Sequence, residues 1–585
     1  MRQEVRFLLA ITLMIIVLVG TNILFPPVPP EEAIGPSGEA AGQLDGTGVT
    51  GEPSVSPDGT DASAAPAGGA ETDPFGRPPA TGPNPVFGPE VVAAGVPEDT
   101  VLVEGPLYRF AWSTIGARLI SAQLLQFESF DVEGPAELLV AESDGALAMQ
   151  LRVDEGELDL GAERFSVEPA AGLRLVEGGG PQTLTFRYAH PTGRLTLQTA
   201  YTFDPSSYVI DVRTEVVGAD RPLLVTSMGS GLAYNESNHR EESTVMGYVT
   251  NHLRDGIDDE RLSKVDEPSV TEGPLIWGAL KSKYFIFAVM PGQEGSEQYL
   301  GGLTASPAPG DDQALVALSH TVGNNGTVDY RLFMGPQDRD ILLSFENELE
   351  EANPYGYRWM RPVVRPVVSI VLSILNFLHR NLNVGYGWVL IIFGVMMRVL
   401  LFPLNQKAMR AQMRNMAVQP LLQEIQKKYK DQPEKLQKEM MKLYKDHGFN
   451  PLAGCLPMLL PWPVLITLFF VFRNTIQLRG ESFLWLPNLA AADPLYILPV
   501  LLGLSMFLMQ FITVRSMPEP NPQMKMMMWI MPIMMTVIFF NFASGLNLYY
   551  ATANVATIPQ QYLIAKERRE LREKGPAKPP DKSGD

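Results

Sequence analysis

Arg398 is the residue whose position in the chain most needs a chemical explanation. It lies within the apolar stretch Gly387–Leu404, which is long enough to cross the hydrocarbon core of a bilayer as a helix. A charge at that depth is costly and normally faces a protein interior or water. No apolar stretch near the C-terminus contains Asp or Glu, so the protonated guanidinium has no membrane carboxylate to pair with and must be solvated.

Two arrangements would solvate this arginine. Arg398 is about six residues, or roughly 9 Å at helical rise, from the cytoplasmic end of its stretch, so its side chain could snorkel to the head groups. Alternatively it lines a hydrated pocket within a helical bundle. The residues alone favour neither arrangement. Polar residues of other apolar stretches that could line such a pocket are Gln510, Asn541, Asn547, Asn554 and Gln560.

The composition argues against several other kinds of site. The single cysteine, Cys455, rules out an intrachain disulfide and a cysteine-based zinc site, and the six histidines show no metal-ligand spacing. No P-loop pattern is present. The net charge of −19 argues against a nucleic-acid-binding surface. We therefore expect no catalytic residue, no metal, no cofactor and no nucleic-acid specificity.

Six apolar stretches predict a multi-pass membrane protein. The first follows Arg2 and Arg6 and lacks an A-x-A-type cleavage site, which indicates an uncleaved signal anchor over residues 1–25 rather than a cleaved signal peptide. Five others fall within residues 383–565, the predicted transmembrane core. Their approximate bounds are Gly387–Leu404, Leu452–Phe472, Leu495–Val514, Met526–Phe542 and Leu546–Ala565.

The distribution of basic residues predicts the orientation of these spans. Residues 403–450 contain ten Lys or Arg against five Asp or Glu, and the tail 566–585 is also net basic. The positive-inside rule places both segments and the N-terminus in the cytoplasm. The long region between the first and second spans is then outside. Six spans with both termini cytoplasmic satisfy every basic segment at once.

The outside region divides into three parts. Residues 26–97 are rich in Pro, Gly, Ala, Ser and Thr and predict a flexible linker. Residues 98–350 alternate apolar and polar side chains, for example over 183–188 and 208–216, and predict an antiparallel β-sandwich. Residues 358–380 carry a broad apolar stripe with basic residues beside it, which favours an interfacial helix on the outer membrane surface. A seventh span is the alternative.

Residues 403–450 repeat apolar side chains at three- and four-residue spacing, with a break at Asp431-Gln-Pro-Glu. This pattern predicts an antiparallel helical hairpin in the cytoplasm. Further along the chain, Met524–Met535 contains seven methionines, whose flexible side chains suit contact with varied apolar partners or ordinary packing against lipid.

Six ordered motifs make residues 358–565 resemble the YidC/Oxa membrane protein insertases. The long outside β region and the signal anchor resemble the Gram-negative form of that family. The motifs are RVLLFPL (398–404), QP (419–420) with IQKKY (425–429), LQKEMMKLY (436–444), NPLAGCLPML (450–459), DPLYILPVLLG (493–503) and SGLNLYY (544–550).

The resemblance implies a fold and a function. The fold would be an N-terminal anchor, a periplasmic β-supersandwich of the sugar-mutarotase type, and a five-helix bundle with a cytoplasmic hairpin, giving six transmembrane helices. The function would be insertion and chaperoning of inner-membrane proteins, alone or beside the Sec translocon. Its implied partners are nascent membrane proteins and the lipid bilayer, with the ribosome and the signal recognition machinery as further candidates.

By the same resemblance, Arg398 and the functional tyrosine, here Tyr550, belong to a hydrophilic groove open to the cytoplasm and to lipid. Such a groove shortens the hydrocarbon path of a polar tail, and a fixed positive charge attracts acidic residues. The apolar segment of the incoming protein would slide along the third and fifth spans. The residues implied there are Met458, Leu459, Met528, Met531 and Met535.

Three positions depart from the family pattern. Gly394 stands where some members carry a hydroxyl, Pro461 adds a proline to a span, and Asn547 adds an amide.

Two other functions compete with insertion of membrane proteins. A small-solute transporter or channel is the main alternative, but coupled transporters usually carry a membrane carboxylate. A sugar-processing enzyme would need convergent histidines and carboxylates, and the outside histidines follow no such motif.

Overall fold

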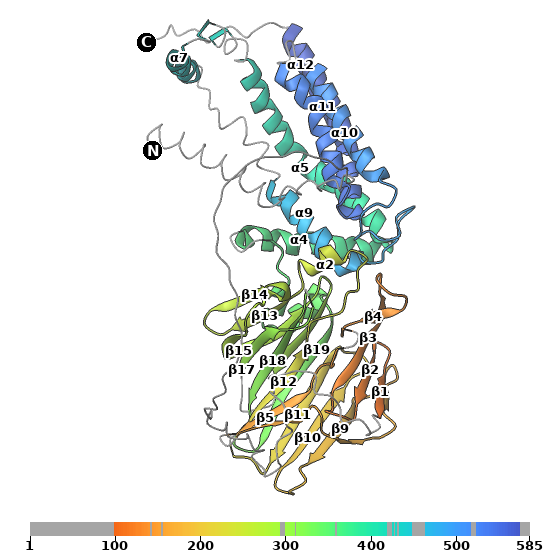
Figure 1. Cartoon of the computed structure of the whole chain (residues 1–585). Coiled ribbons are helices and arrows are strands. Elements are labelled where there is room, and N and C mark those ends of the chain that lie inside the picture. Colours follow the sequence, from red (N-terminus) through yellow and green to blue (C-terminus); the bar gives the residue numbers. More distant parts are fainter. Residues whose placement is uncertain are drawn as a thin grey trace, which may run out of the picture. The chain divides into compact units, whose positions relative to one another are not determined.

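The computed structural model describes the chain from residue 99 to residue 573 with gaps (Figure 1). The chain separates into two compact units. One contains residues 70–417 and 457–585, and the other contains residues 1–69 and 418–456. The expected anchor and linker, together with Met458, Leu459 and most of the C-terminal tail, lie outside the described residues. These are 99–140, 143–153, 156–220, 222–292, 299–310, 312–356, 360–417, 424–425, 428–429, 432–446, 462–515 and 522–573.

The first half of the described chain is a β domain of two sheets. The smaller sheet has the strand order β4-β3-β2-β1-β8, and only the β1–β8 pair is parallel. Its strands are β1 (Thr100–Glu104), β2 (Tyr108–Ser113), β3 (Leu119–Glu128), β4 (Pro135–Glu137) and β8 (Leu173–Arg174).

The larger sheet has fourteen strands. Twelve follow the order β6-β5-β12-β18-β17-β15-β16-β19-β11-β10-β9-β7, and of the other two β13 pairs with β15 and β14 pairs with β13. They are β5 (Met149–Val153), β6 (Gly156–Asp159), β7 (Ser166–Glu168), β9 (Gln182–Ala189), β10 (Thr196–Phe203), β11 (Val209–Val217), β12 (Leu223–Gly229), β13 (Gly247–His252), β14 (Gly256–Arg261), β15 (Ser269–Lys281), β16 (Phe285–Pro291), β17 (Leu300–Pro307), β18 (Ala314–Thr321) and β19 (Thr327–Pro336).

The apolar residues that alternate with polar residues in the sequence are the buried residues of these strands. Along β9, Leu184, Phe186 and Tyr188 are buried and the residues between them are not. Apolar side chains from the two sheets meet in the core, since the Trp112 ring of β2 lies 4.4 Å from the Tyr201 ring of β10. Each sheet therefore has one face packed against the other, and the expected β-sandwich is confirmed.

Four short helical segments interrupt or follow the strands of the sandwich. They are α2 (His239–Ser243), the 3₁₀ turns η1 (Leu262–Lys264) and η2 (Leu349–Ala352), and α3 (Arg339–Leu343). In α2, the Asn238 side chain accepts the backbone N–H of Glu241 at 3.2 Å and so caps the helix. This cap holds the glutamates of α2 in place beside the ends of the long helices.

Long helices make up the C-terminal part. They are α4 (Arg361–Leu382), α5 (Tyr386–Ala417), α7 (Pro433–Asp446), α9 (Trp462–Asn474), α10 (Ile497–Arg515), α11 (Pro522–Phe539) and α12 (Ser544–Glu573), with the 3₁₀ turn η3 (Ile476–Leu478) after α9. Helix α5 passes through Pro403 without ending, so the first arm of the expected hairpin continues the preceding span. Helix α7 begins at Pro433, inside the predicted break.

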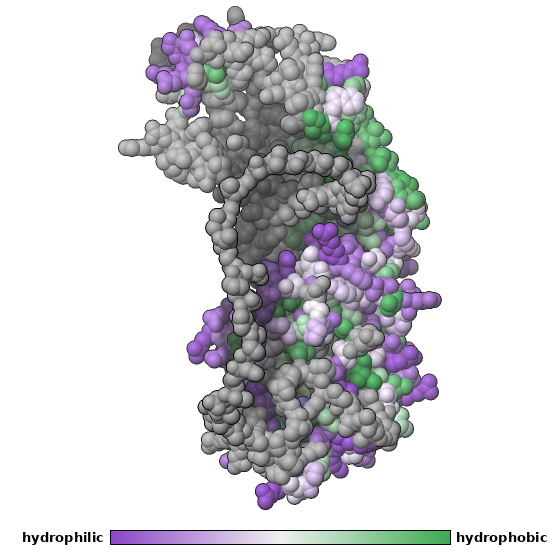
Figure 2. All heavy atoms as spheres, in the orientation of Figure 1, coloured by the Kyte–Doolittle hydropathy of each residue, from purple (hydrophilic) through white to green (hydrophobic). Residues whose placement is uncertain are grey.

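Three of the described helices are long and apolar enough to cross a membrane, namely α4, the Tyr386–Pro403 part of α5, and α10. The described part of α11 contains a shorter apolar helix, Met528–Phe539. Exposed apolar side chains gather on α10 and α11, and Figure 2 shows hydrophobic surface over this part of the bundle, whereas the coloured surface over the β domain mixes hydrophilic and hydrophobic residues. A C-terminal region of apolar helices is thereby confirmed.

Helix α4 lies along the end of the β domain. The Arg365 guanidinium is 2.8 Å from the Glu351 carboxylate, and the Asn376 amide, three turns further on, is 3.3 Å from Asp340. The other face of α4 exposes apolar residues at seven-residue spacing, with Val363, Ile370 and Phe377 more than half exposed. One face is therefore bound to the β domain while the opposite face is apolar and uncovered among the described residues.

Candidate functional site

The helix that carries Arg398 packs closely against α12. A Cβ atom added to Gly394, one turn before the arginine, would lie 3.3 Å from the Thr552 methyl group. A side chain larger than that of glycine would therefore press against Thr552. Helices α10 and α11 approach even more closely, because a Cβ atom on Gly503 would lie 1.9 Å from the Thr536 hydroxyl. Small residues at these contacts let helix backbones come together inside a membrane.

Arg398 is half-buried on α5. Its guanidinium lies within electrostatic range of the Tyr549 and Tyr550 hydroxyls. None of the described carboxylates interacts with it. The structure therefore brings together Arg398 and Tyr550, two of the residues expected to share a site, although they come from the first and last helices of the core.

An aromatic cluster surrounds these tyrosines. The Phe393 and Phe472 rings both lie 5.7 Å from the Tyr549 ring, so α5, α9 and α12 meet there. The Phe539 ring lies 5.4 Å from the Tyr550 ring and 5.0 Å from the Phe542 ring. We call these rings, together with Phe469 at 5.3 Å from Phe542, the aromatic layer. It brings rings from α5, α9, α11 and α12 together beside Arg398.

A polar stripe continues along α12 from Tyr550. Asn554 and Thr557 follow at helical spacing, and both are buried. The Asn554 amide donates to the Ser505 hydroxyl of α10 at 3.2 Å. Gln560 is also buried, and its amide nitrogen has no hydrogen-bond partner among the described residues. Two expected site residues, Tyr550 and Asn554, thus belong to one stripe.

Other expected site residues lie elsewhere. The Asn547 amide donates to the backbone carbonyls of Phe539 and Phe542 at 3.1 and 3.3 Å, so it ties α12 to the end of α11. Gln510 is half-buried on α10. Asn541 lies in the connection between α11 and α12, where it lines a pocket that does not include Arg398.

Methionines of α11 lie beside an apolar surface. Met528, Met531 and Met535 are half-buried, while Trp529 and Ile533 between them are more than half exposed. Helix α11 therefore presents a continuous apolar face whose exposed part is made by residues other than the expected methionines. Met458 and Leu459 lie outside the described residues, and the second wall of the expected slide is not described beyond α9.

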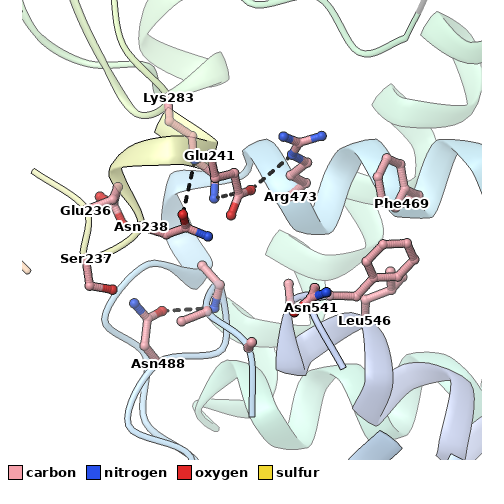
Figure 3. Close-up of a pocket in the computed structure, with 15 residues that line it drawn as sticks. Glu236, Ser237, Asn238, Glu241, Lys283, Phe469, Arg473, Asn488, Asn541 and Leu546 are labelled. Carbon is pink, nitrogen blue, oxygen red and sulfur yellow. Dashed lines mark hydrogen bonds and ion pairs between the residues drawn. The ribbon is translucent and has the colours of Figure 1, made fainter. Parts of the chain in front are cut away.

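A second site lies where the β domain meets the helix ends, and we call it the junction pocket. Its volume is about 470 Å³. Figure 3 shows the polar side chains that face each other across it. The lining residues are Glu236, Ser237, Asn238, Glu241, Lys283, Phe469, Arg473, Asn488, Ala490, Ala491, Ala492, Asn541, Phe542, Ala543 and Leu546.

Ion pairs between the β domain and the bundle form one wall of the junction pocket. A single oxygen of the Glu241 carboxylate accepts from Lys283 Nζ at 3.0 Å and from Arg473 Nε at 3.2 Å. Beside it, Arg479 Nε donates to Glu236 at 2.6 Å. Burial alone would raise the pKa of Glu241, but Lys283 and Arg473 outweigh it and hold that pKa below its usual value. Glu241 is therefore ionised.

A third carboxyl group lies behind this wall. Glu242 is buried, and one of its oxygens accepts the backbone N–H groups of Asn235 and Glu236 at 3.1 and 3.0 Å. Burial raises its pKa to about 7. The other oxygen has no hydrogen-bond partner among the described residues. The charge of this group therefore changes near neutral pH.

The sequence analysis did not identify the junction pocket. Glu241 and Arg473 are separated by 232 residues, and no local spacing connects them. The available signal was the pair Arg473 and Arg479, two basic residues just after an apolar stretch on the side predicted to be outside. The positive-inside rule disfavours basic residues there, which suggests that they have specific partners.

Two family models and several curated relatives match this chain. Residues 100–370 match the family model described as YidC periplasmic domain, and residues 377–571 match the model described as 60Kd inner membrane protein. The membrane protein insertase YidC of Geobacter metallireducens is 30% identical over 570 residues, covering 96% of this chain and 98% of the relative. That of Chlorobaculum parvum is 32% identical, covering 80% and 82%. A crystal structure of an active YidC insertase, 18% identical, superposes over 80% of this chain and 93% of that chain with a TM-score of 0.33.

Proposed function

Because the chain belongs to the YidC family of membrane protein insertases, we propose that it inserts integral proteins into the bacterial inner membrane through a hydrophilic groove containing Arg398. The observation that carries this proposal is the half-buried position of Arg398 within the apolar part of α5. Its guanidinium interacts with the tyrosines of α12 within the bundle and with no described carboxylate. A half-buried arginine on which no described carboxylate acts leaves its positive charge available to an incoming acidic group.

The groove acts on the polar tail of the incoming protein, which we call the client. Arg398 attracts acidic residues of the tail, while Tyr550, Asn554 and Gln510 provide polar partners that replace water. The membrane potential favours outward movement of negative charge. The aromatic layer lies beside Arg398 and keeps the groove closed on the outer side between clients.

The hydrophobic segment of the client moves along α11. Exposed apolar side chains such as Trp529 and Ile533 offer it a surface of the same polarity as lipid. Lateral transfer into the bilayer then follows from the segment's own hydrophobicity. Met528, Met531 and Met535 lie next to this surface and adapt to side chains of different shape. No nucleotide is required.

The surrounding parts have supporting roles in this proposal. The β domain and the exposed face of α4 lie on the periplasmic side, with α4 resting on the membrane surface, because its contacts to Glu351 and Asp340 hold it along the β domain. The hairpin over residues 403–450 recruits clients at the cytoplasmic mouth. The protein acts alone, beside the Sec translocon, and as a chaperone for membrane proteins.

The competing functions find less support. A coupled small-solute transporter normally carries an acidic residue at mid-membrane, and the apolar stretches of the core contain none. A sugar-processing enzyme in the β domain would use convergent histidines. His320 is instead buried against the Tyr330 ring at 4.4 Å, with burial lowering its pKa to about 4, and His239 pairs with Asp131 at 2.6 Å.

The test uses the full chain reconstituted in liposomes. Arg398→Ala should reduce insertion of clients with acidic translocated tails by about tenfold, with a smaller effect on purely apolar clients, because only the former need the charge. Arg515→Ala is the matched control, since it removes a basic residue at the end of α10. A photo-crosslinker at position 398 should capture an arrested acidic tail. Equal insertion of both client classes by Arg398→Ala would contradict the groove.

A further inference from the structure

The junction pocket lies one helical turn from Tyr550, which is within electrostatic range of Arg398. Leu546 lines the pocket and Tyr550 lies beside the arginine, and four residues of α12 correspond to about 6 Å. The Phe539 ring contacts both the Tyr550 ring and the Phe542 ring, and Phe542 lines the pocket. A single aromatic layer therefore separates the junction pocket from the arginine site.

Two cations and two carboxylates line the junction pocket, but one of these carboxylates is paired with a cation outside the lining. Glu236 pairs with Arg479, which is not a lining residue, so the lining cations Lys283 and Arg473 share the Glu241 carboxylate. The Arg473 side chain uses only Nε for its ion pair, and its two Nη groups donate to no described residue. Arginine presents its donors as a planar fork that suits a second carboxylate. An additional anionic group in the pocket would therefore find donors that are not already used.

The remaining lining matches a polypeptide. Asn238, Asn488 and Asn541 bring three carboxamide side chains into one pocket, and Figure 3 shows them on the β-domain side and the bundle side. The Asn238 and Asn488 side-chain oxygens already accept backbone N–H groups of this chain, so these two carboxamides offer their NH₂ groups to the carbonyls of a peptide, while Asn541 can donate and accept. Phe469 and Leu546 add an apolar floor, but the β domain supplies a polar wall opposite to it. This mixture suits an extended peptide better than the acyl chains of a lipid.

We propose that the junction pocket is the receiving site for the acidic tail of a client after it leaves Arg398, and that Arg473 binds the carboxylates of that tail. The inference rests on the proposed function and identifies the site that the acidic tail occupies after Arg398. The tail passes from one arginine to another across the aromatic layer. Binding at Arg473 holds the tail on the outer side while the hydrophobic segment moves into lipid.

The experiment uses the full chain in liposomes with an imposed membrane potential. The client is a single-span protein with an acidic translocated tail, and its partner client carries Asn or Gln in place of each Asp or Glu. Arg473→Gln should reduce translocation of the acidic tail by about tenfold and leave the neutral tail nearly unchanged, because one charge-assisted contact is lost. Arg365→Gln, which removes an ion pair between α4 and the β domain outside the pocket, should change neither.

Two further measurements keep the inference testable if Arg473→Gln perturbs the junction. Asn541→Glu places a negative charge at an exposed position of the pocket and should also slow only the acidic tail. A photo-crosslinker at position 541 in the otherwise unchanged chain should capture the acidic tail of an arrested client. That adduct should weaken in the Arg473→Gln variant while the adduct at position 398 persists.

The outcomes separate this inference from the proposed function. Adducts to the tail at position 398 but never at position 541 would overturn the receiving site and leave the groove intact. An adduct at position 541 to phospholipid instead of client would likewise overturn it and identify a lipid site. The receiving site would also be overturned if Arg473→Gln reduced translocation of the acidic and the neutral tail equally and Asn541→Glu changed translocation of neither tail. Failure of the unchanged chain to insert either client would instead contradict the proposed function.

Discussion

Arg479 Nε lies 2.6 Å from the Glu236 carboxylate, although 243 residues separate the two in the chain. The Arg479 side chain is 2% exposed, and its guanidinium also lies over the Phe130 ring at 4.6 Å and the Phe285 ring at 5.1 Å. A buried charge needs a partner because its desolvation is otherwise uncompensated. The pair therefore links the β domain to the connection that follows α9.

Replacing Arg479 should weaken this link. Arg479→Met keeps much of the side-chain length but leaves Glu236 buried without its partner, so we expect a loss of about 3 kcal/mol in the free energy of unfolding. Thermal unfolding of the full chain in detergent would measure the change.

The double variant Glu236→Gln/Arg479→Met supplies the control for this prediction. It removes the unpaired charge and should recover part of the lost stability. A double variant that is less stable than Arg479→Met would show that the ion pair is not the cause.

The contact between Gly503 and Thr536 predicts a second effect. Gly503→Ala would put a Cβ atom 1.9 Å from the Thr536 hydroxyl, which itself donates to the Pro532 carbonyl at 2.8 Å, so α10 and α11 should be forced apart at a cost of about 2 kcal/mol. Thermal unfolding in detergent is the measurement.

Adding Thr536→Ala removes the clashing oxygen and should restore most of the stability, while Gly394→Ala, whose nearest contact would be 3.3 Å, should be tolerated better. If Gly503→Ala and Gly394→Ala lowered the stability of the protein equally, the close approach of α10 and α11 would be contradicted.

The stability of the region around α2 should depend on pH because of Glu242. Its pKa is raised to about 7 from an ordinary value of 4.5 by burial, so the folded state binds a proton more tightly than the unfolded state does. The stability contributed by the neutral form is complete below pH 4.5 and is lost as pH rises through 7. Amide exchange at Asn235 and Glu236, corrected for intrinsic rates, should become faster between pH 5.5 and pH 8.

Glu242→Gln cannot ionise and should remove most of this pH dependence. Glu236→Gln serves as the comparison, because it changes a neighbouring carboxyl group whose charge is paired with Arg479. A pH profile that stays unchanged in Glu242→Gln would exclude Glu242 as its origin.

Polar substitutions on the exposed face of α11 should impair insertion of clients. Ile533 is 62% exposed, and Ile533→Asn should reduce insertion of a client whose hydrophobic segment is only marginally apolar, by about fivefold, because a polar group is placed on the path of that segment. Val500→Asn on α10, where the side chain is 53% exposed, is the matched control. Insertion assays with segments of graded hydrophobicity would measure both, and equal defects would argue against a path along α11.

Local patterns were sufficient to predict much of the fold. The alternation over residues 183–188 predicted β9 because side chains of a strand point to opposite faces whatever the strand pairs with. Apolar length predicted α5 and α10 for a similar reason, since a helix satisfies its own backbone hydrogen bonds in lipid. The need to solvate Arg398 also followed from its neighbours in the chain.

Partners across the fold could not be predicted in the same way. Nothing in the spacing distinguishes Asn554, which contacts α10 through Ser505, from Asn541, which lines the junction pocket. The pairing of Glu241 with Lys283 and Arg473 depends on how the β domain meets the helix ends. Such contacts are made between distant segments, and their positions follow from packing rather than from local preference.

The amino-acid sequence by itself determined that a charge lies in the membrane-spanning part of this protein without a carboxylate in the same apolar stretches. Hydrophobicity and charge are properties of single residues and their neighbours, so they can be read along the chain. Only the tertiary structure decided that Arg398 comes within electrostatic range of Tyr549 and Tyr550, and that a second arginine, Arg473, lines a pocket together with Phe469 and Phe542 of the aromatic layer. Those relationships depend on helix packing in three dimensions, where residues far apart in sequence come into contact.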